Sequence, residues 1–189
     1  MFNEKVRLMM MSFLLMFVFV VEGGPLSPLG LVSELRPRLS LEAADAMADA
    51  AIGEAKRRDF KDIAVFVLDA QGRTIVSKTM IDCASLPARL AQAKASACVC
   101  TQTSSRALRD KYVPERTPQL VAMIVVGTDA GLPLAAVPGG VLCRDKSTGH
   151  IVGAIGVSGA SADEDEHCAL VGANAIAGLT TEPAQTALT

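Results

Sequence analysis

The chain has 189 residues, of which 50% are hydrophobic, 4% aromatic and 20% charged, and its formal net charge is −2. This length suits a single domain. The near-neutral charge indicates neither a polybasic surface for nucleic acid nor an acidic disordered tail. We therefore expect one globular domain with an aliphatic core and no nucleic-acid partner.

Residues 1–23 differ in composition from the rest and are typical of a secretory signal peptide. Lys5 and Arg7 form a basic flank, an apolar run follows from Leu8 to Val21, and cleavage is expected after Gly23. The run is shorter than the roughly 20 residues that span a membrane. We expect a secreted or extracytoplasmic protein with no stable membrane span after cleavage. The alternative is an organellar presequence or an anchor through residues 8–21.

The remaining chain divides into three predicted segments. Residues 24–38 are rich in Pro, Gly and Ser and are typical of a linker. The folded domain is expected at 39–178, and a C-terminal tail at 179–189. After cleavage the domain would keep only three aromatic residues, Phe60, Phe66 and Tyr112.

The domain is predicted to open with a helix and a hairpin. Ser40 is a candidate N-cap, and small or aliphatic residues recur on one helix face as far as Ala55. The apolar run at 63–68, the turn at 69–72 and the run at 74–80 together indicate two antiparallel strands.

A second helix is predicted to begin at Ser85, a candidate N-cap, and to run toward Leu108. Residues 120–126 fit either a strand or a buried helix, because periodicity cannot decide for so short a run. The loop between these segments contains Tyr112.

The last third of the chain predicts a second hairpin and a final helix. Residues 141–143 and 150–158 flank a polar loop, as two antiparallel strands would. The sequence Ser161-Ala162-Asp163-Glu164 is a capping box that opens the helix. The whole order indicates an α+β fold, in which helices pack on a mostly antiparallel sheet.

The glycine-rich stretch Gly153–Gly159 lies between a predicted strand and a helix, where phosphate-binding loops occur. Its spacing matches neither the dinucleotide-binding nor the Walker pattern, and four acidic residues follow at 163–166. Those carboxylates stabilise the positive helix terminus themselves, so a phosphate is disfavoured there. We interpret the stretch as a close-packed glycine strand.

Metal and nucleophile motifs are weak. Glu164, His167 and Cys168 could share a helix face, but one Glu-x-x-His is insufficient for a di-iron site. Cys98 and Cys100 would point to nearly opposite sides of a helix, which disfavours a metal clip. We therefore expect no metal site. Two histidines and no G-x-S-x-G elbow make a hydrolase triad hard to build, and no catalytic residue is identified.

Several stretches resemble the GlcG/HbpS-like family: Ile63–Gly72, Ala93-Lys94-Ala95, Val137–Val141, and above all Ile151–Ala160 with Asp165-Glu166-His167-Cys168-Ala169. The resemblance covers roughly Leu39 to Ala177. It implies a profilin-like three-layer α/β/α fold with a five-stranded antiparallel sheet, assembled into homo-oligomers. It also implies haem binding, and in some members haem degradation, in an oxidative-stress or haem-handling role.

Haem is therefore the expected cofactor, on a surface groove or at a subunit interface, because three aromatic residues are few for an enclosed pocket. Tyr112 ranks first as an iron ligand, since three basic residues between 109 and 116 could pair with the propionates. His167 ranks second because it lies beside the glycine strand. Lys94 matches the family's helix motif and could pair with an anionic ligand, although a solvated lysine is the simpler interpretation.

Two other functions stay open. In the first, the chain is an enzyme accessory or a catabolic enzyme, and Pro138-Gly139-Gly140 and the glycine strand line a pocket for a small organic acid or a corrinoid. In the second, the chain is a structural homo-oligomer without a ligand.

Overall fold

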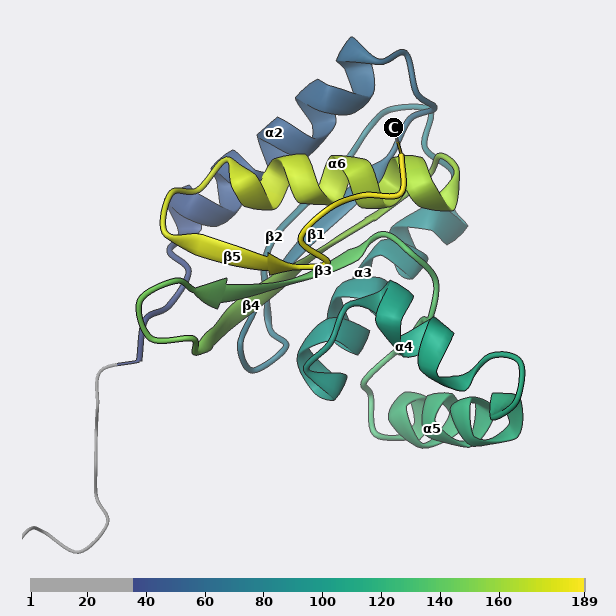
Figure 1. Ribbon diagram of the computed structural model, residues 1–189. Helices are drawn as coiled ribbons and strands as arrows, with labels where there is room; N and C mark the ends of the chain where they lie inside the picture. The colour runs from purple at the N-terminus through teal and green to yellow at the C-terminus, as the bar shows by residue number, and fades with distance from the viewer. Residues whose placement is uncertain (1–35, 189) are drawn as a thin grey trace, which may run out of the picture. The chain divides into compact units, whose positions relative to one another are not determined.

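The computed structural model describes residues 36–188, and from Pro37 onward they form one unit (Figure 1). The predicted signal peptide and almost all of the predicted linker lie outside the described residues. The helices of the unit are α2 (Leu41–Arg57), α3 (Ser85–Thr101), α4 (Ser105–Tyr112), α5 (Thr117–Asp129) and α6 (Ala162–Asn174). The strands are β1 (Ala64–Asp69), β2 (Thr74–Thr79), β3 (Gly140–Asp145), β4 (Ile151–Ser158) and β5 (Leu179–Glu182).

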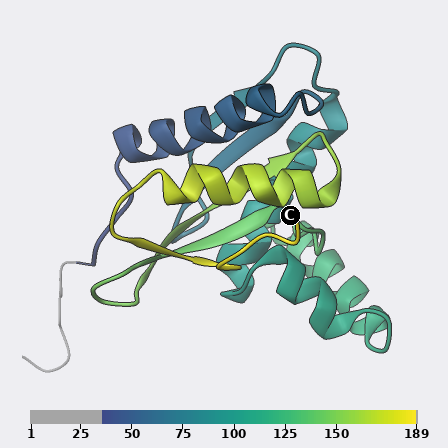
Figure 2. The same cartoon turned by 45° about the horizontal axis from the view of Figure 1, so that its top comes forward.

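The five strands form one sheet in the order β2-β1-β4-β3-β5, and every neighbouring pair is antiparallel. Helices α2 and α6 lie together on one face of the sheet and α3 lies on the other, in both views of the molecule (Figures 1 and 2). This three-layer α/β/α arrangement confirms the predicted α+β, profilin-like fold.

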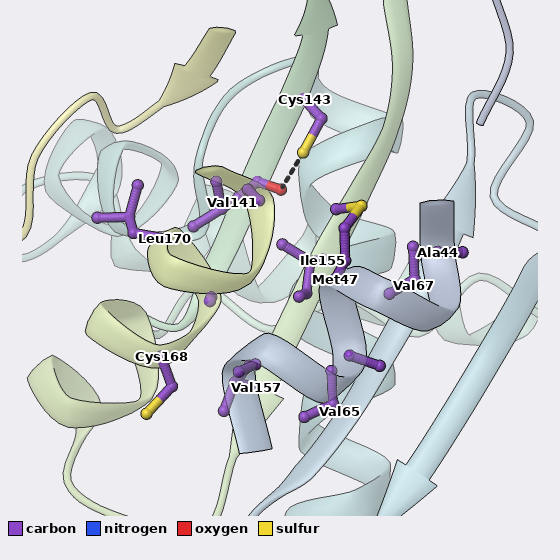
Figure 3. Close-up of a cluster of buried hydrophobic side chains, with 14 of the residues drawn as sticks. Ala44, Met47, Val65, Val67, Val141, Cys143, Ile155, Val157, Cys168 and Leu170 are labelled. Carbon is purple, nitrogen blue, oxygen red and sulfur yellow. Dashed lines mark hydrogen bonds between the residues drawn. The ribbon is translucent and has the colours of Figure 1, made fainter. Parts of the chain in front are cut away.

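The larger core lies between the sheet and the α2–α6 layer. Val65 and Val67 of β1 and Ile155 and Val157 of β4 point to this face, where they surround Met47 of α2 (Figure 3). Burial of one such side chain contributes about 1.5–3 kcal/mol. The alternating strand pattern therefore fixes which face of the sheet receives these helices.

The opposite face is covered by α3 at very short range. A Cβ atom placed on Gly156 of β4 would lie 2.1 Å from the carbonyl oxygen of Ala91 in α3. Only a residue without a side chain allows the helix backbone to approach the strand this closely. The predicted close-packed glycine strand is confirmed, and its tight contact is with α3.

The structure differs from the sequence prediction at four places. The helix predicted to run from Ser85 toward Leu108 is two helices, because α3 ends at Thr101 and Leu108 belongs to α4, and Tyr112 is the last residue of α4 instead of a loop residue. Residues 120–126, for which a strand and a helix were both open, belong to helix α5. The N-cap of α3 is Ala84, one residue before the predicted Ser85. The segment 179–189, predicted as a tail, contains β5, whose sequence Leu-Thr-Thr-Glu carries too few apolar residues to show a strand pattern.

Two further properties bear on the site. All five cysteines are free, and burial raises the pKa of the Cys143 thiol to about 12. In the described part of the chain, no helix combines the length and the hydrophobicity needed to cross a membrane.

Candidate functional site

Helices α4 and α5 form a hairpin that extends from the main sheet and has its own small core. The Ser104 side chain accepts a hydrogen bond from the Ala107 backbone amide (3.1 Å) and so caps the start of α4. Leu108 of α4 and Leu120 of α5 are buried with Ala97 of α3. These contacts hold the hairpin against α3 and leave the outer side of α5 uncovered.

The outer side of α5 carries an apolar stripe formed by Val121, Ala122, Val125 and Val126. The three valines are 52%, 61% and 69% exposed, respectively. Spacings of one, three and four residues place these side chains on one side of the helix, opposite Leu120. A contiguous apolar surface of this kind marks a binding site more often than scattered single residues do.

Basic residues gather at the N-terminal end of this α5 stripe. The Arg116 backbone amide donates a hydrogen bond to the Tyr112 carbonyl oxygen (2.6 Å), which holds the two residues together. The Lys111 ammonium lies 5.5 Å from the centre of the Tyr112 ring. Lys111 and Arg116 are exposed, and neither forms an ion pair with another residue between 36 and 188. The Tyr112 ring is half-buried against the small core.

Lys94 forms a buried ion pair that joins the two helical layers. Its Nζ atom donates hydrogen bonds to Asp165 Oδ2 (2.8 Å) and to the Val157 carbonyl oxygen (2.9 Å), and both charged side chains are at most 3% exposed. Burial lowers the pKa of Lys94 and raises the pKa of Asp165, and in each case the opposite charge of the partner opposes the shift. The interpretation of Lys94 as a solvated lysine is therefore wrong.

A second ion pair flanks the first at the start of α6. The Nε atom of Arg106 donates to both carboxylate oxygens of Glu166 (2.8 and 3.0 Å), and Arg106 also contacts Asp163. Glu166 is fully buried. Its pKa is raised by burial against the lowering effect of Arg106. Two of the four acidic residues that follow the glycine stretch, Asp165 and Glu166, are thus buried and paired.

His167 lies on another side of α6 and faces α2. Its Nε2 atom is 2.7 Å from Glu54 Oε1, and the same carboxylate receives hydrogen bonds from Arg57 and Arg58. The Arg57 hydrogen bond lowers the pKa of Glu54 to about 2, against burial, and those from His167 and Arg58 add to the effect. This cluster connects the two helices of one layer, and it commits one ring nitrogen of His167 to a carboxylate.

The three residues predicted to bind haem do not come together. The Tyr112 ring packs against the small core of the α4–α5 hairpin, Lys94 is buried in its ion pair, and His167 is held against α2. Lys94 therefore has no surface at which to meet an anionic ligand. The α5 stripe was missed because periodicity did not distinguish a helix from a strand at 120–126, and the sequence gives no sign that Asp165 is the partner of Lys94.

The glycine turn before β3 offers no space for a ligand. A Cβ atom on Gly139 would lie 2.8 Å from Lys94 Nζ, and one on Gly140 would lie 2.8 Å from Cys98 Sγ. Because Lys94 and Cys98 occupy the space beside these glycines, the structure argues against the predicted small-molecule pocket at Pro138-Gly139-Gly140. Among residues 36–188 no group of three His, Cys, Asp or Glu side chains is placed to hold a metal ion.

The fold and the surface described above define a three-layer α+β domain with an exposed apolar and basic helical hairpin. Residues 39–174 match the model of a family described as haem degrading protein HbpS-like. The chain therefore belongs to the HbpS-like family. No curated protein sequence matches it.

Solved structures with this fold include two structures of HbpS. HbpS is 28% identical with a TM-score of 0.60, over 74% of this chain and 91% of that chain. A double mutant of Streptomyces reticuli HbpS is 27% identical with a TM-score of 0.60, over 74% and 88%. The PduOC:heme complex is 24% identical with a TM-score of 0.66, over 77% and 99%, and at this identity it shows the fold alone.

Proposed function

We propose that the protein binds haem on the outer surface of the α4–α5 hairpin. The observation that carries this proposal is the exposed apolar stripe on α5 with unpaired cations at one end. Haem is a planar apolar macrocycle with two carboxylates on one edge. A surface that is apolar along its length and cationic at one end matches both parts of that molecule.

The dimensions and charges of the surface suit this ligand. The α5 stripe itself spans roughly 7.5 Å from Val121 to Val126 at 1.5 Å per residue. The exposed Pro118 lies three residues before Val121 on the same side of the helix and extends the apolar surface to roughly 12 Å, which is comparable to the width of a porphyrin ring. Lys111 and Arg116 lie at the cationic end, where they can pair with the propionates. Tyr112 lies between these cations in the sequence, and a tyrosine is one of the side chains that ligate haem iron.

Family membership supports haem as the ligand, but it gives less support to the α4–α5 hairpin as the place where haem binds. The family description names haem degradation, and a protein of the same fold was solved with heme. Degradation of the macrocycle would also need dioxygen and an external electron donor. The low aromatic content of the domain agrees with a surface site instead of an enclosed pocket.

Hemin titration of the full chain tests the proposal. A saturable Soret band should form, and Tyr112→Phe should shift its position because the phenolate ligand is lost. Lys111→Ala combined with Arg116→Ala should weaken binding at least tenfold at low salt. Lys61→Ala is the matched control, since Lys61 is exposed but lies on the α2–β1 connection, and it should leave the titration unchanged.

Two outcomes would contradict the proposal in different ways. If the Soret spectrum of free hemin is unchanged by the protein, haem binding itself is wrong. If hemin binds but the Tyr112 and the cation variants behave like the Lys61 control, haem lies elsewhere on the protein.

A further inference from the structure

The first turn of α4 is fixed by polar contacts to two neighbouring elements. The Ser105 hydroxyl accepts a hydrogen bond from the Gly140 amide (2.8 Å) and donates one to the Gly140 carbonyl oxygen (3.3 Å), which attaches the helix to β3. The Arg106 guanidinium donates to both carboxylate oxygens of Glu166 and also contacts Asp163, which attaches the helix to α6. A planar group held by two carboxylates is fixed in orientation as well as in position.

The rest of α4 is held against the main sheet domain by apolar contacts, which are not directional. Leu108 is buried with Ala97 of α3, and the Tyr112 ring packs one turn further along against the same small core. Such contacts keep the helix against α3 but allow it to rotate or to slide. The direction of α4 is therefore set at its first turn, where Arg106 supplies the charged part of the attachment.

The proposed iron ligand is sensitive to this attachment because it lies at the other end of the helix. Tyr112 comes six residues after Arg106, which is about 9 Å along the helix at 1.5 Å per residue. A tilt of roughly 10° at the first turn would displace that end by about 1.6 Å. A side chain that ligates a metal has to be held within about 0.5 Å of its working position.

We propose that Arg106 is a positioning residue for the haem site, and that its contact with Glu166 holds Tyr112 in place for the iron. This inference rests on the proposed haem site and adds the residue that orients it. Glu166 is fully buried in α6, and Arg106 is the one cation between residues 36 and 188 that forms an ion pair with it. A movement of α4 would leave this carboxylate buried without its counter-charge, which is costly and so opposes the movement.

Spectra of the full chain at saturating hemin test the proposal, because saturation separates the geometry of iron ligation from affinity. Arg106→Met should shift the Soret band toward the position seen with Tyr112→Phe, and it should weaken hemin binding at least threefold. Arg106→Lys keeps the charge and should recover part of the wild-type spectrum. In the Tyr112→Phe background, Arg106→Met should change the spectrum no further, because the ligand that it positions is already lost.

Two buried carboxylates provide a matched control with the same substitution. Glu166→Gln removes the charge that anchors Arg106 and should shift the Soret band in the same direction as Arg106→Met. Glu54→Gln also removes a buried carboxylate that is paired with arginines, but this one lies in the contact between α2 and α6, away from α4. It should lower stability and leave the spectrum at saturating hemin unchanged.

The outcomes separate this inference from the haem site itself. If Tyr112→Phe shifts the Soret band but Arg106→Met and Glu166→Gln do not, the positioning role is overturned and the haem site stands. An equal shift in Glu54→Gln also overturns it, because general loosening of the fold then explains the effect. If hemin does not bind, or Tyr112→Phe leaves the spectrum unchanged, Tyr112 is not the ligand and the positioning role is overturned with it. Should Arg106→Met fail to fold, Arg106→Lys and Glu166→Gln decide the question.

Discussion

At the scale of single residues, the most consequential contact is the ion pair between Lys94 and Asp165. Both side chains are removed from water, and Asp165 uses its second oxygen to accept a hydrogen bond from the Ala160 amide (3.0 Å). Removing one member of such a pair leaves an uncompensated buried charge, whereas removing both members does not. The pair therefore joins α3 to the start of α6 through charge as well as packing.

We predict that Lys94→Met lowers the free energy of unfolding by about 3–5 kcal/mol, as expected for a broken buried pair. Lys94→Met combined with Asp165→Leu should recover most of this loss, since no buried charge remains. Urea unfolding of both single variants and the double variant gives the coupling energy directly. Additive single effects would show that the two side chains act independently.

Glu54 provides a second residue-scale prediction, which concerns pH. Its pKa is lowered from the ordinary value of 4.5 to about 2 in the folded protein, and the hydrogen bond from Arg57 is the largest cause. Because the folded pKa is below the unfolded one, this stabilisation is present above pH 4.5 and is lost as the pH falls toward 2. Glu54→Gln should cost about 1–3 kcal/mol at pH 7 and progressively less below pH 4.5.

Unfolding free energies measured between pH 7 and pH 2.5 check this expectation. The wild-type protein and Glu54→Gln should converge as the pH falls. Glu115→Gln is the control, because Glu115 is exposed and forms no ion pair within the described range. A constant difference between wild type and Glu54→Gln across this range would contradict the role of the carboxylate charge.

At the scale of secondary-structure elements, the contact of α3 with β4 depends on a glycine. We predict that Gly156→Ala lowers the free energy of unfolding by about 3 kcal/mol or more, because the new methyl group meets the Ala91 carbonyl oxygen and α3 must shift. Gly53→Ala is the opposite case: nothing lies within 4 Å of its added Cβ atom. This change in α2 should stabilise the protein by up to about 1 kcal/mol.

Thermal or urea unfolding of the two glycine variants measures both effects with the same substitution. If Gly156→Ala is as stable as wild type, α3 is free to move away from the sheet and the tight packing does not limit stability.

The elements also show which parts of the structure could be predicted from the sequence. The capping box at Ser161 and the hairpin around Asp69 were predicted because their signals are local: a side chain bonds to backbone amides within four residues. Helix α5 and strand β5 were not assigned, since their identity depends on tertiary partners. The α5 stripe gives no polar side that would reveal a helix period, and β5 is a short strand whose partner β3 lies more than 30 residues away.

The candidate site was predictable only in part for the same reason. The sequence placed Tyr112 among basic residues, and the structure keeps these residues at the start of α5. The burial of Lys94 could not be predicted, because its partner Asp165 lies 71 residues along the chain and belongs to the opposite layer. Long-range pairing of charges leaves no periodic pattern in a single sequence.

At the scale of the whole molecule, we expect the two ends of the chain to contribute differently to the stability of the folded domain. Residues 37–188 contain the complete sheet and all three apolar cores. At the other end, β5 pairs with β3 from Leu142 to Asp145, and Glu182 accepts hydrogen bonds from the Thr103 hydroxyl and the Ser104 amide. The last strand therefore connects the edge of the sheet to the start of the α4–α5 hairpin.

We predict that a chain beginning at Pro37 unfolds with nearly the free energy of the full protein, within about 0.5 kcal/mol, because no described core is removed. A chain ending at Gly178 should lose more than about 2 kcal/mol, since the β3 edge and the Ser104 amide lose hydrogen bonds worth about 1 kcal/mol each. Urea unfolding of the two truncated chains measures the difference. The reverse order, in which the shortened N-terminus lowers the free energy of unfolding more, would show that residues before Pro37 contribute to the stability of the folded domain.

Because the chain ending at Gly178 also releases the hairpin from β5, its hemin affinity should fall together with its stability, whereas the chain beginning at Pro37 should bind hemin like the full protein.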